Sequence, residues 1–274
     1  MIVVPIFVPA KLGIIQMRKF WPLLMVVVLL MGSSYPLDIY VNERTSTEIC
    51  FMVQDQMFPK HWYNPVINAE AEPLARSERQ RFIAILNRTF AKYPDKVLRE
   101  NLDRIYGLKK MKFYGVAFGG TNIRNTVFIC DDETNPSFTD EYIEGVFHHE
   151  FSSVLKRSYP RYFNAGAWEA ANSPAFIYGN GGVHAIMNGE ASMLLDPEYY
   201  DKGLLTKYSQ ASVEEDINVF AQNLFTGNQE FWEIVDNNYR IRKKAFLLIG
   251  FYQKIDPKMN EDYFRRLNSR VAKR

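Results

Sequence analysis

The features that this sequence lacks are the first guide to what it does. Its 274 residues carry a net charge of +2 and no basic cluster, so the electrostatic signature of a nucleic-acid-binding protein is missing. It has no internal repeat, no low-complexity tract, no Gly-rich phosphate loop and no convincing pairing of a nucleophile with a base. The sequence therefore gives no sign of a nucleic-acid partner, a phosphate-binding loop or a site for nucleophilic catalysis.

Cysteine is also scarce. Cys50 and Cys130 are the 2 cysteines of the chain, and 80 positions separate them. They could pair in an oxidising compartment. Cys130 lies in an apolar, strand-like run, which favours a buried free thiol instead.

What is present is typical of a globular protein. Hydrophobic residues make up 47% of the sequence and charged residues 23%. Aromatic residues reach 15%, with 16 Tyr and 20 Phe, which is enough for a substantial core. The length allows one large domain or two small ones.

The N-terminal segment predicts export. Two basic residues, Arg18 and Lys19, precede an apolar run of about a dozen residues and then small residues, which is the pattern of a secretory signal. The run is short for a transmembrane span. We therefore expect an over-extended start at 1–16, a signal peptide at 17–34 and an extracytoplasmic protein, in the periplasm or cell envelope, that meets the membrane only through this segment.

The end of the signal resembles the lipobox of a bacterial lipoprotein. Leu30, Met31 and Gly32 are followed by Ser33, where a lipobox needs the thiol of a cysteine to carry the lipid. The sequence therefore predicts a chain without this lipid, cleaved after Ser34.

The spacing of apolar residues predicts a mixed chain of helices and strands. Residues 35–75 contain four prolines and read as irregular. The later elements are expected, in order, as a helix from Ser77 to Pro94, a helix over 95–106, strands at 112–118 and 125–130 joined by a turn at 119–122, and a C-terminal docking helix over 240–256.

The stretch FHHEFSSVLKR, residues 147–157, carries the first candidate site. It belongs to a helix capped near Ser137 or Thr139, and His149, Glu150 and Ser153 fall on its apolar face. Buried polar groups need partners or a ligand. The pattern indicates either a binding site or a buried histidine that is hydrogen-bonded to Glu150 and other core groups.

A second candidate segment lies downstream. Ser212 begins a helix, and Glu215 is three positions after it, which is the spacing of a capping box. Glu215 is therefore either a capping carboxylate or a ligand that a second helix supplies. Tyr208 precedes Glu215 by seven positions and is expected to point at the same site.

Together these segments resemble zincin-like metallopeptidases of the anthrax lethal factor type, and more closely the zinc-binding metallopeptidase lipoproteins of Bacteroidetes. The resemblance covers about residues 76–225 and is carried by the order strand, His-Glu helix, long loop, Tyr-x6-Glu. It implies that His149 and Glu215 bind zinc, that Glu150 is the general base, and that Tyr208 stabilises the oxyanion. It also implies a peptide or protein substrate and an envelope assembly for nutrient or polysaccharide uptake.

The chain departs from this family at the most diagnostic position. The second histidine of H-E-x-x-H is replaced by Ser153, a poor ligand for zinc. His148 adjoins His149, but successive helical residues point about 100° apart, so joint chelation is strained. His184 lies in a glycine-rich loop that could fold close to the site, and it is either the third metal ligand or a loop histidine without that role.

The sequence thus predicts a single α+β domain over 35–274, in which a small mixed sheet packs on an active-site helix. Its parts are a helical N-terminal region at 35–110, the active-site core at 111–225 and C-terminal helices at 226–274. The predicted function is that of a zinc metallopeptidase-like hydrolase with weak zinc occupancy. The alternative is a non-catalytic, metal-free protein that kept the zincin fold and its cleft.

Overall fold

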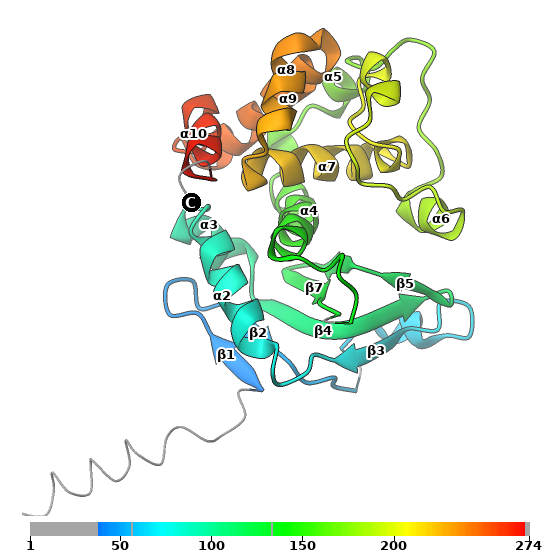
Figure 1. The fold of residues 1–274 in the computed structure, drawn as a ribbon, viewed down its shortest axis with the longest axis vertical. Coiled ribbons are helices and arrows are strands. Elements are labelled where there is room, and N and C mark those ends of the chain that lie inside the picture. The colour runs from blue at the N-terminus through cyan, green and yellow to red at the C-terminus, as the bar shows by residue number, and fades with distance from the viewer. Residues whose placement is uncertain (1–37, 56, 133, 272–274) are drawn as a thin grey trace, which may run out of the picture. The chain divides into compact units, whose positions relative to one another are not determined.

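The computed structural model describes residues 38–55, 57–132 and 134–271, which belong to one compact unit. The predicted signal peptide, its lipobox-like end and the over-extended start fall outside the described residues. Within that unit the chain is α+β, as predicted, with a mixed sheet on one side of a long helix (Figure 1).

A mixed sheet is built around one long strand, β4 (Arg104–Phe113). Its path runs β1-β2-β4-β7-β6, and β3 and β5 pair with the later part of β4. The pairings β2–β4 and β4–β7 are parallel, and the others are antiparallel. The other strands are β1 (Ile39–Val41), β2 (Glu48–Cys50), β3 (Glu70–Pro73), β5 (Val116–Phe118), β6 (Gly120–Ile123) and β7 (Thr126–Cys130).

Helices cover one face of this sheet and continue beyond it (Figure 1). The central one is α4 (Asp140–Ser158), which contacts β6 and β7 and is crossed by α7 (Val213–Thr226). The other helices are α2 (Arg79–Phe90), α3 (Asp95–Asn101), α5 (Ala165–Glu169), α6 (Gly182–Met187), α8 (Gln229–Asn237), α9 (Tyr239–Ile255) and α10 (Glu261–Val271). Short 3-10 turns occur at η1 (Lys60–Tyr63), η2 (Pro160–Tyr162), η3 (Pro197–Lys202) and η4 (Tyr208–Gln210).

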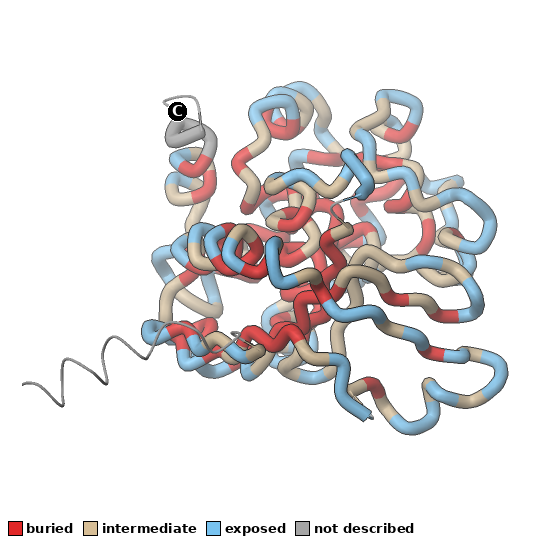
Figure 2. Tube along the Cα trace, turned by 60° about the horizontal axis from the view of Figure 1, so that its bottom comes forward, coloured by how far each residue is buried: buried red, intermediate tan, exposed pale blue. Residues whose placement is uncertain are grey.

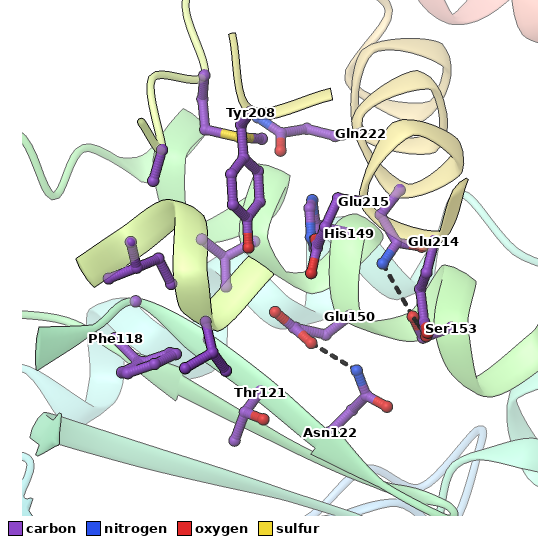
Figure 3. A pocket seen from close by; sticks show the side chains of 18 of the residues that line it. Phe118, Thr121, Asn122, His149, Glu150, Ser153, Tyr208, Glu214, Glu215 and Gln222 are labelled. Atoms are coloured by element: carbon purple, nitrogen blue, oxygen red, sulfur yellow. Dashed lines mark hydrogen bonds and ion pairs between the residues drawn. The ribbon is translucent and has the colours of Figure 1, made fainter. Parts of the chain in front are cut away.

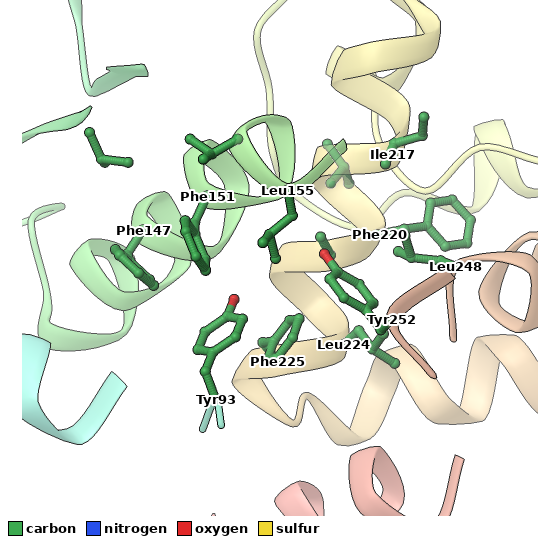
Figure 4. Packing of buried hydrophobic residues seen from close by; sticks show 14 of the residues in the cluster. Tyr93, Phe147, Phe151, Leu155, Ile217, Phe220, Leu224, Phe225, Leu248 and Tyr252 are labelled. Atoms are coloured by element: carbon green, nitrogen blue, oxygen red, sulfur yellow. The ribbon is translucent and has the colours of Figure 1, made fainter. Parts of the chain in front are cut away.

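The main core lies between α4, α7 and the C-terminal helices, where aromatic rings are concentrated (Figure 4). Phe147 and Phe151 of α4 face Tyr93, whose ring stacks on Phe225 of α7 with centroids 4.3 Å apart. Buried residues run through the inside of the unit while its loops are exposed (Figure 2). This packing fixes α4 against α7, the two helices that carry the candidate site.

A second apolar cluster fills the other face of the sheet, around Phe58, Phe113 and Phe128. Cys50 and Cys130 belong to it, and both are buried free thiols, as the apolar run around Cys130 indicated. Burial raises the pKa of both thiols, to about 12 for Cys130.

Several predicted boundaries were wrong. The stretch 35–75, expected to be irregular, contains three strands. The helix expected over 95–106 ends at Asn101, because Ile105 belongs to β4 and is buried between the parallel strands β2 and β7. The turn expected at 119–122 is largely strand β6. The turns fall instead at Tyr114–Gly115 and at Arg124, where φ is positive.

The predicted C-terminal docking helix is confirmed as α9, whose Leu248 and Tyr252 are fully buried. No helix within the described ranges is long and apolar enough to cross a membrane.

Candidate active site

Helix α4 delivers three polar side chains to a pocket. Thr139 caps it by accepting a hydrogen bond from the Tyr142 amide, which confirms one of the two predicted caps. His149, Glu150 and Ser153 line the pocket, but the predicted single face was wrong, because α4 is buried on two sides. The core residues Phe147 and Phe151 lie on one side, and the polar residues lie with Val146 on the other.

The pocket has a volume of about 400 Å³ and lies between α4, β6, α7 and the α6 segment. Strand β6 forms one wall through Gly120, Thr121 and Asn122. Gly120 permits this close approach, because a Cβ there would lie 2.8 Å from Glu150 Oε1. The Gly-Gly pair that suggested a turn is therefore needed for contact between the sheet and α4.

His149 and Glu215 meet across this pocket, with Nε2 and Oε2 2.9 Å apart (Figure 3). Ser212 caps α7 by accepting a hydrogen bond from the Glu215 backbone amide, as predicted, but the Glu215 carboxylate does not act as a cap and turns to His149 instead. Burial lowers the pKa of His149, but the hydrogen bond and charge of Glu215 outweigh burial, so the pKa is raised. The pair is an ion pair when the imidazole is protonated.

Glu150 is 9% exposed and projects into the space between Tyr208 and Asn122 (Figure 3). The Asn122 amide donates to its Oε2 at 2.6 Å, whereas Oε1 has no hydrogen-bond donor in the described part of the chain. Burial raises the pKa of this carboxyl to about 7, although His149 and Asn122 lower it. At neutral pH Glu150 can therefore both hold and release a proton.

Tyr208 lies over the His149 ring, with centroids 6.0 Å apart and an interplanar angle of 24°. Burial and the nearby Glu215 and Glu150 raise the pKa of its phenol well above the ordinary value, so the hydroxyl stays a hydrogen-bond donor. Gly182 begins α6 directly against this group: a Cβ there would lie 2.4 Å from Tyr208 Oη and 2.2 Å from Glu215 Oε1. The α6 segment therefore closes tightly over the site.

Ser153 is held in hydrogen bonds that the sequence did not predict. Its hydroxyl donates to Glu214 Oε1 at 2.6 Å and accepts from Asn218 Nδ2 at 2.8 Å (Figure 3). Glu214 and Asn218 are four residues apart on α7, so helical spacing places them on one face. This four-residue spacing next to Glu215 is the one feature of the sequence that could have pointed to Glu214 and Asn218. No feature of the sequence pointed to Asn122.

The structure does not bring His184 to the other predicted ligands. His184 is exposed on α6, outside the pocket, whereas its neighbours Val183 and Ile186 line the pocket. His148 points away from His149: its Nδ1 lies 2.9 Å from Tyr93 Oη and its Nε2 3.4 Å from Glu144 Oε1. This geometry agrees with the expectation that His148 and His149 do not bind one metal ion together.

Comparison with known proteins gives one informative likeness. No protein-family model and no curated protein matches the chain. A solved structure from Bacteroides caccae, described as a candidate zinc-binding metallopeptidase, superposes with a TM-score of 0.51 and 15% sequence identity. It covers 94% of this chain and 95% of that chain. The chain has a metallopeptidase-like fold.

A metallopeptidase-like fold raises the question of whether these residues fit zinc. A catalytic zinc has three protein ligands and a water. Ser153 lies four residues after His149, where the family resemblance would place a second histidine. A metal-bound histidine also donates its second ring nitrogen to a supporting group, whereas the buried Nδ1 of His149 has no partner among the described residues. Across residues 38–55, 57–132 and 134–271, no group of three or more His, Cys, Asp or Glu side chains could hold a metal. The site does not fit a three-ligand zinc centre.

Proposed function

We propose that this protein is a peptide-binding protein of the bacterial cell envelope, built on a zincin-type fold and working without bound metal. One observation carries the proposal: Ser153 occupies the position of a zinc ligand and its hydroxyl is engaged by Glu214 and Asn218. With His149 paired to Glu215, helices α4 and α7 are joined directly by side chains. Protein groups thus supply the connection between the two helices that a shared ion would otherwise make.

The wall that β6 forms supports a peptide as the ligand. β6 ends the sheet, pairing with β7 on one side and with no strand on the other in the described chain. An exposed strand edge offers unpaired amides and carbonyls to an extended peptide. Because Gly120, Thr121 and Asn122 also line the pocket, a peptide added to β6 would place side chains beside Glu150.

A zinc-dependent hydrolase is the second candidate, and the 2.9 Å approach of His149 to Glu215 favours it. These are two of the side chains that the family resemblance assigns to zinc. Glu150, with a pKa of about 7, is suited to exchange a proton, and the Tyr208 hydroxyl to donate to an oxyanion. This function would need a third metal ligand that the described residues do not provide.

The envelope location is part of the proposal. It is supported by the signal-like segment at 17–34 and by the resemblance to envelope lipoproteins. A role beside the proteins of a nutrient or polysaccharide uptake assembly follows from the same resemblance.

Equilibrium binding of fluorescein-labelled extended peptides tests the choice between the two functions. The purified protein is titrated in EDTA and again with added zinc, and the peptides are then checked for cleavage by mass spectrometry. The proposal expects the same affinity in both conditions and intact peptides. Binding that requires zinc, or cleavage that appears with zinc, would overturn it in favour of the hydrolase.

A further inference from the structure

The pocket is divided into an apolar end and an acidic end. The apolar end lies on the side of β5 and α6 and is lined by Phe118, Val183, Ile186 and Met193. Ile186 and Met193 pack against the main core through one part of their surface and are only partly buried. They leave apolar surface inside the pocket that an apolar group of a ligand would cover.

The acidic end has the opposite character. Glu150, Glu214 and Glu215 line it, together with His149, and no lysine or arginine is part of the lining. Arg157 approaches Glu214 from the rim, with Nη1 3.9 Å from Oε1. Glu150 lines this end, and its Oε1 accepts no hydrogen bond from the described residues, whereas its Oε2 accepts one from Asn122. A cationic group of a ligand would complement this end.

Resting on the proposed peptide-binding function, we infer that the ligand is a peptide that presents a large apolar side chain next to an amine or guanidinium cation. The apolar side chain lies between Phe118, Val183 and Ile186, and the cation lies against Glu150. The cation is either a Lys or Arg side chain or the free amino terminus of the peptide, since both present the same chemistry.

A peptide series tests the ligand side of this inference by fluorescence anisotropy, in EDTA. The parent peptide carries adjacent Leu and Lys residues and a free amino terminus. Replacing Leu by Gly should weaken binding by about tenfold or more, since a buried leucine side chain contributes that much. Replacing Lys by Glu, or acetylating the amino terminus, should cause a similar loss, and whichever does so identifies the cation.

Paired variants of the protein test the pocket side. Ile186→Asp and Met193→Asp should each lower the affinity for the parent peptide by about tenfold or more. The bound peptide would remove water from the new carboxylate in the apolar end, which is unfavourable. Their neighbours Met187 and Leu194 are 53% and 79% exposed and do not line the pocket, so Met187→Asp and Leu194→Asp are matched controls with little expected effect. Ile186→Ala, compared with Met187→Ala, repeats the test without a new charge, and far-ultraviolet circular dichroism monitors folding.

The outcomes separate this inference from the function on which it rests. If no peptide of the series binds the wild-type protein, peptide binding itself is wrong. If the peptides bind but Leu→Gly, Lys→Glu and acetylation leave the affinity unchanged, peptide binding stands and the inferred ligand class is overturned. Equal effects of Ile186→Asp and Met187→Asp would also overturn it.

Discussion

The sequence predicted the side chains of the site that belong to recognisable motifs, and it missed those that do not. His149, Glu150, Tyr208 and Glu215 line one pocket, as the family resemblance implied. Glu214, Asn218 and Asn122 were not foreseen, because their role depends on a serine that departs from the expected pattern. His184 could not be placed from sequence, since a glycine-rich loop leaves the direction of its side chains open.

Glu150 should make the stability of the protein depend on pH. Burial raises its pKa to about 7, so its contribution to stability is fully present below the unfolded value of 4.5 and is lost as pH rises through 7. Glu150→Gln should therefore raise the free energy of unfolding at pH 8 by about 1–3 kcal/mol and flatten the pH dependence between pH 5 and 7. Urea unfolding at several pH values measures both effects.

Glu144, six residues earlier on α4, is the matched control with the opposite sign. Burial raises its pKa, but His148 and Lys92 outweigh burial and lower it to about 2. Its stabilising contribution is present above the unfolded value of 4.5 and is lost as pH falls through 2. Glu144→Gln should destabilise the protein at pH 7. If both variants shifted stability in the same direction, the assigned environment of Glu150 would be wrong.

At the scale of secondary structure, helix starts were easier to predict than strands. Thr139 and Ser212 cap their helices through local hydrogen bonds that depend on a few neighbouring residues. Strands β1, β2 and β3 are only three or four residues long, and pairing with other strands holds them in place. Strands β2 and β3 pair with β4, and β1 pairs with β2. Such long-range pairing leaves no local signal, so the stretch 35–75 read as irregular.

The start of α6 should tolerate no side chain, because a Cβ at Gly182 would lie 2.2 Å from Glu215 Oε1. Gly182→Ala should displace α6 or Glu215 and weaken peptide binding by about tenfold. Gly250, inside α9, has open space around its Cβ position, and Gly250→Ala should stabilise that helix by about 0.5–1 kcal/mol. Peptide affinity and thermal unfolding of both variants are the measurements; identical behaviour would contradict the tight closure of α6.

Helices α7 and α9 are joined by a buried ion pair between Asp216 and Lys244, 2.5 Å apart and both fully buried. Trp168 Nε1 of α5 and Tyr178 Oη of the segment after α5 also donate to Asp216, the residue next to Glu215. Lys244→Met should cost about 3–5 kcal/mol, because it leaves a buried carboxylate without its cation. Adding Asp216→Asn should recover a large part of that loss, as chemical denaturation would show; additive losses would argue against this pairing.

For the molecule as a whole, composition predicted a globular protein with a substantial aromatic core, and the spacing of apolar residues predicted a mixture of helices and strands. The apolar run around Cys130 also indicated a buried free thiol. Cys50 and Cys130 are buried free thiols on neighbours of β4, and burial raises the pKa of both. The native protein should therefore react with no equivalent of a thiol reagent on the minute scale and with two after denaturation. Rapid reaction of the folded protein would contradict this environment.

Export is a prediction for the whole chain. If 17–34 is a cleaved signal, protein recovered from the cell envelope should begin near Tyr35 and carry no lipid. Amino-terminal sequencing and intact mass measure this directly. A retained Met1 or a lipid-modified residue would contradict it.

The central claim is that Ser153 leaves the site short of a zinc ligand, so zinc content after dialysis against a mild chelator tests it most directly. The wild-type protein should retain far less than one zinc per chain. Ser153→His should restore two histidines one helical turn apart and raise zinc affinity by more than the roughly 10–100-fold that supporting residues contribute. One tightly held zinc per wild-type chain would contradict the account and show that another residue completes a metal centre.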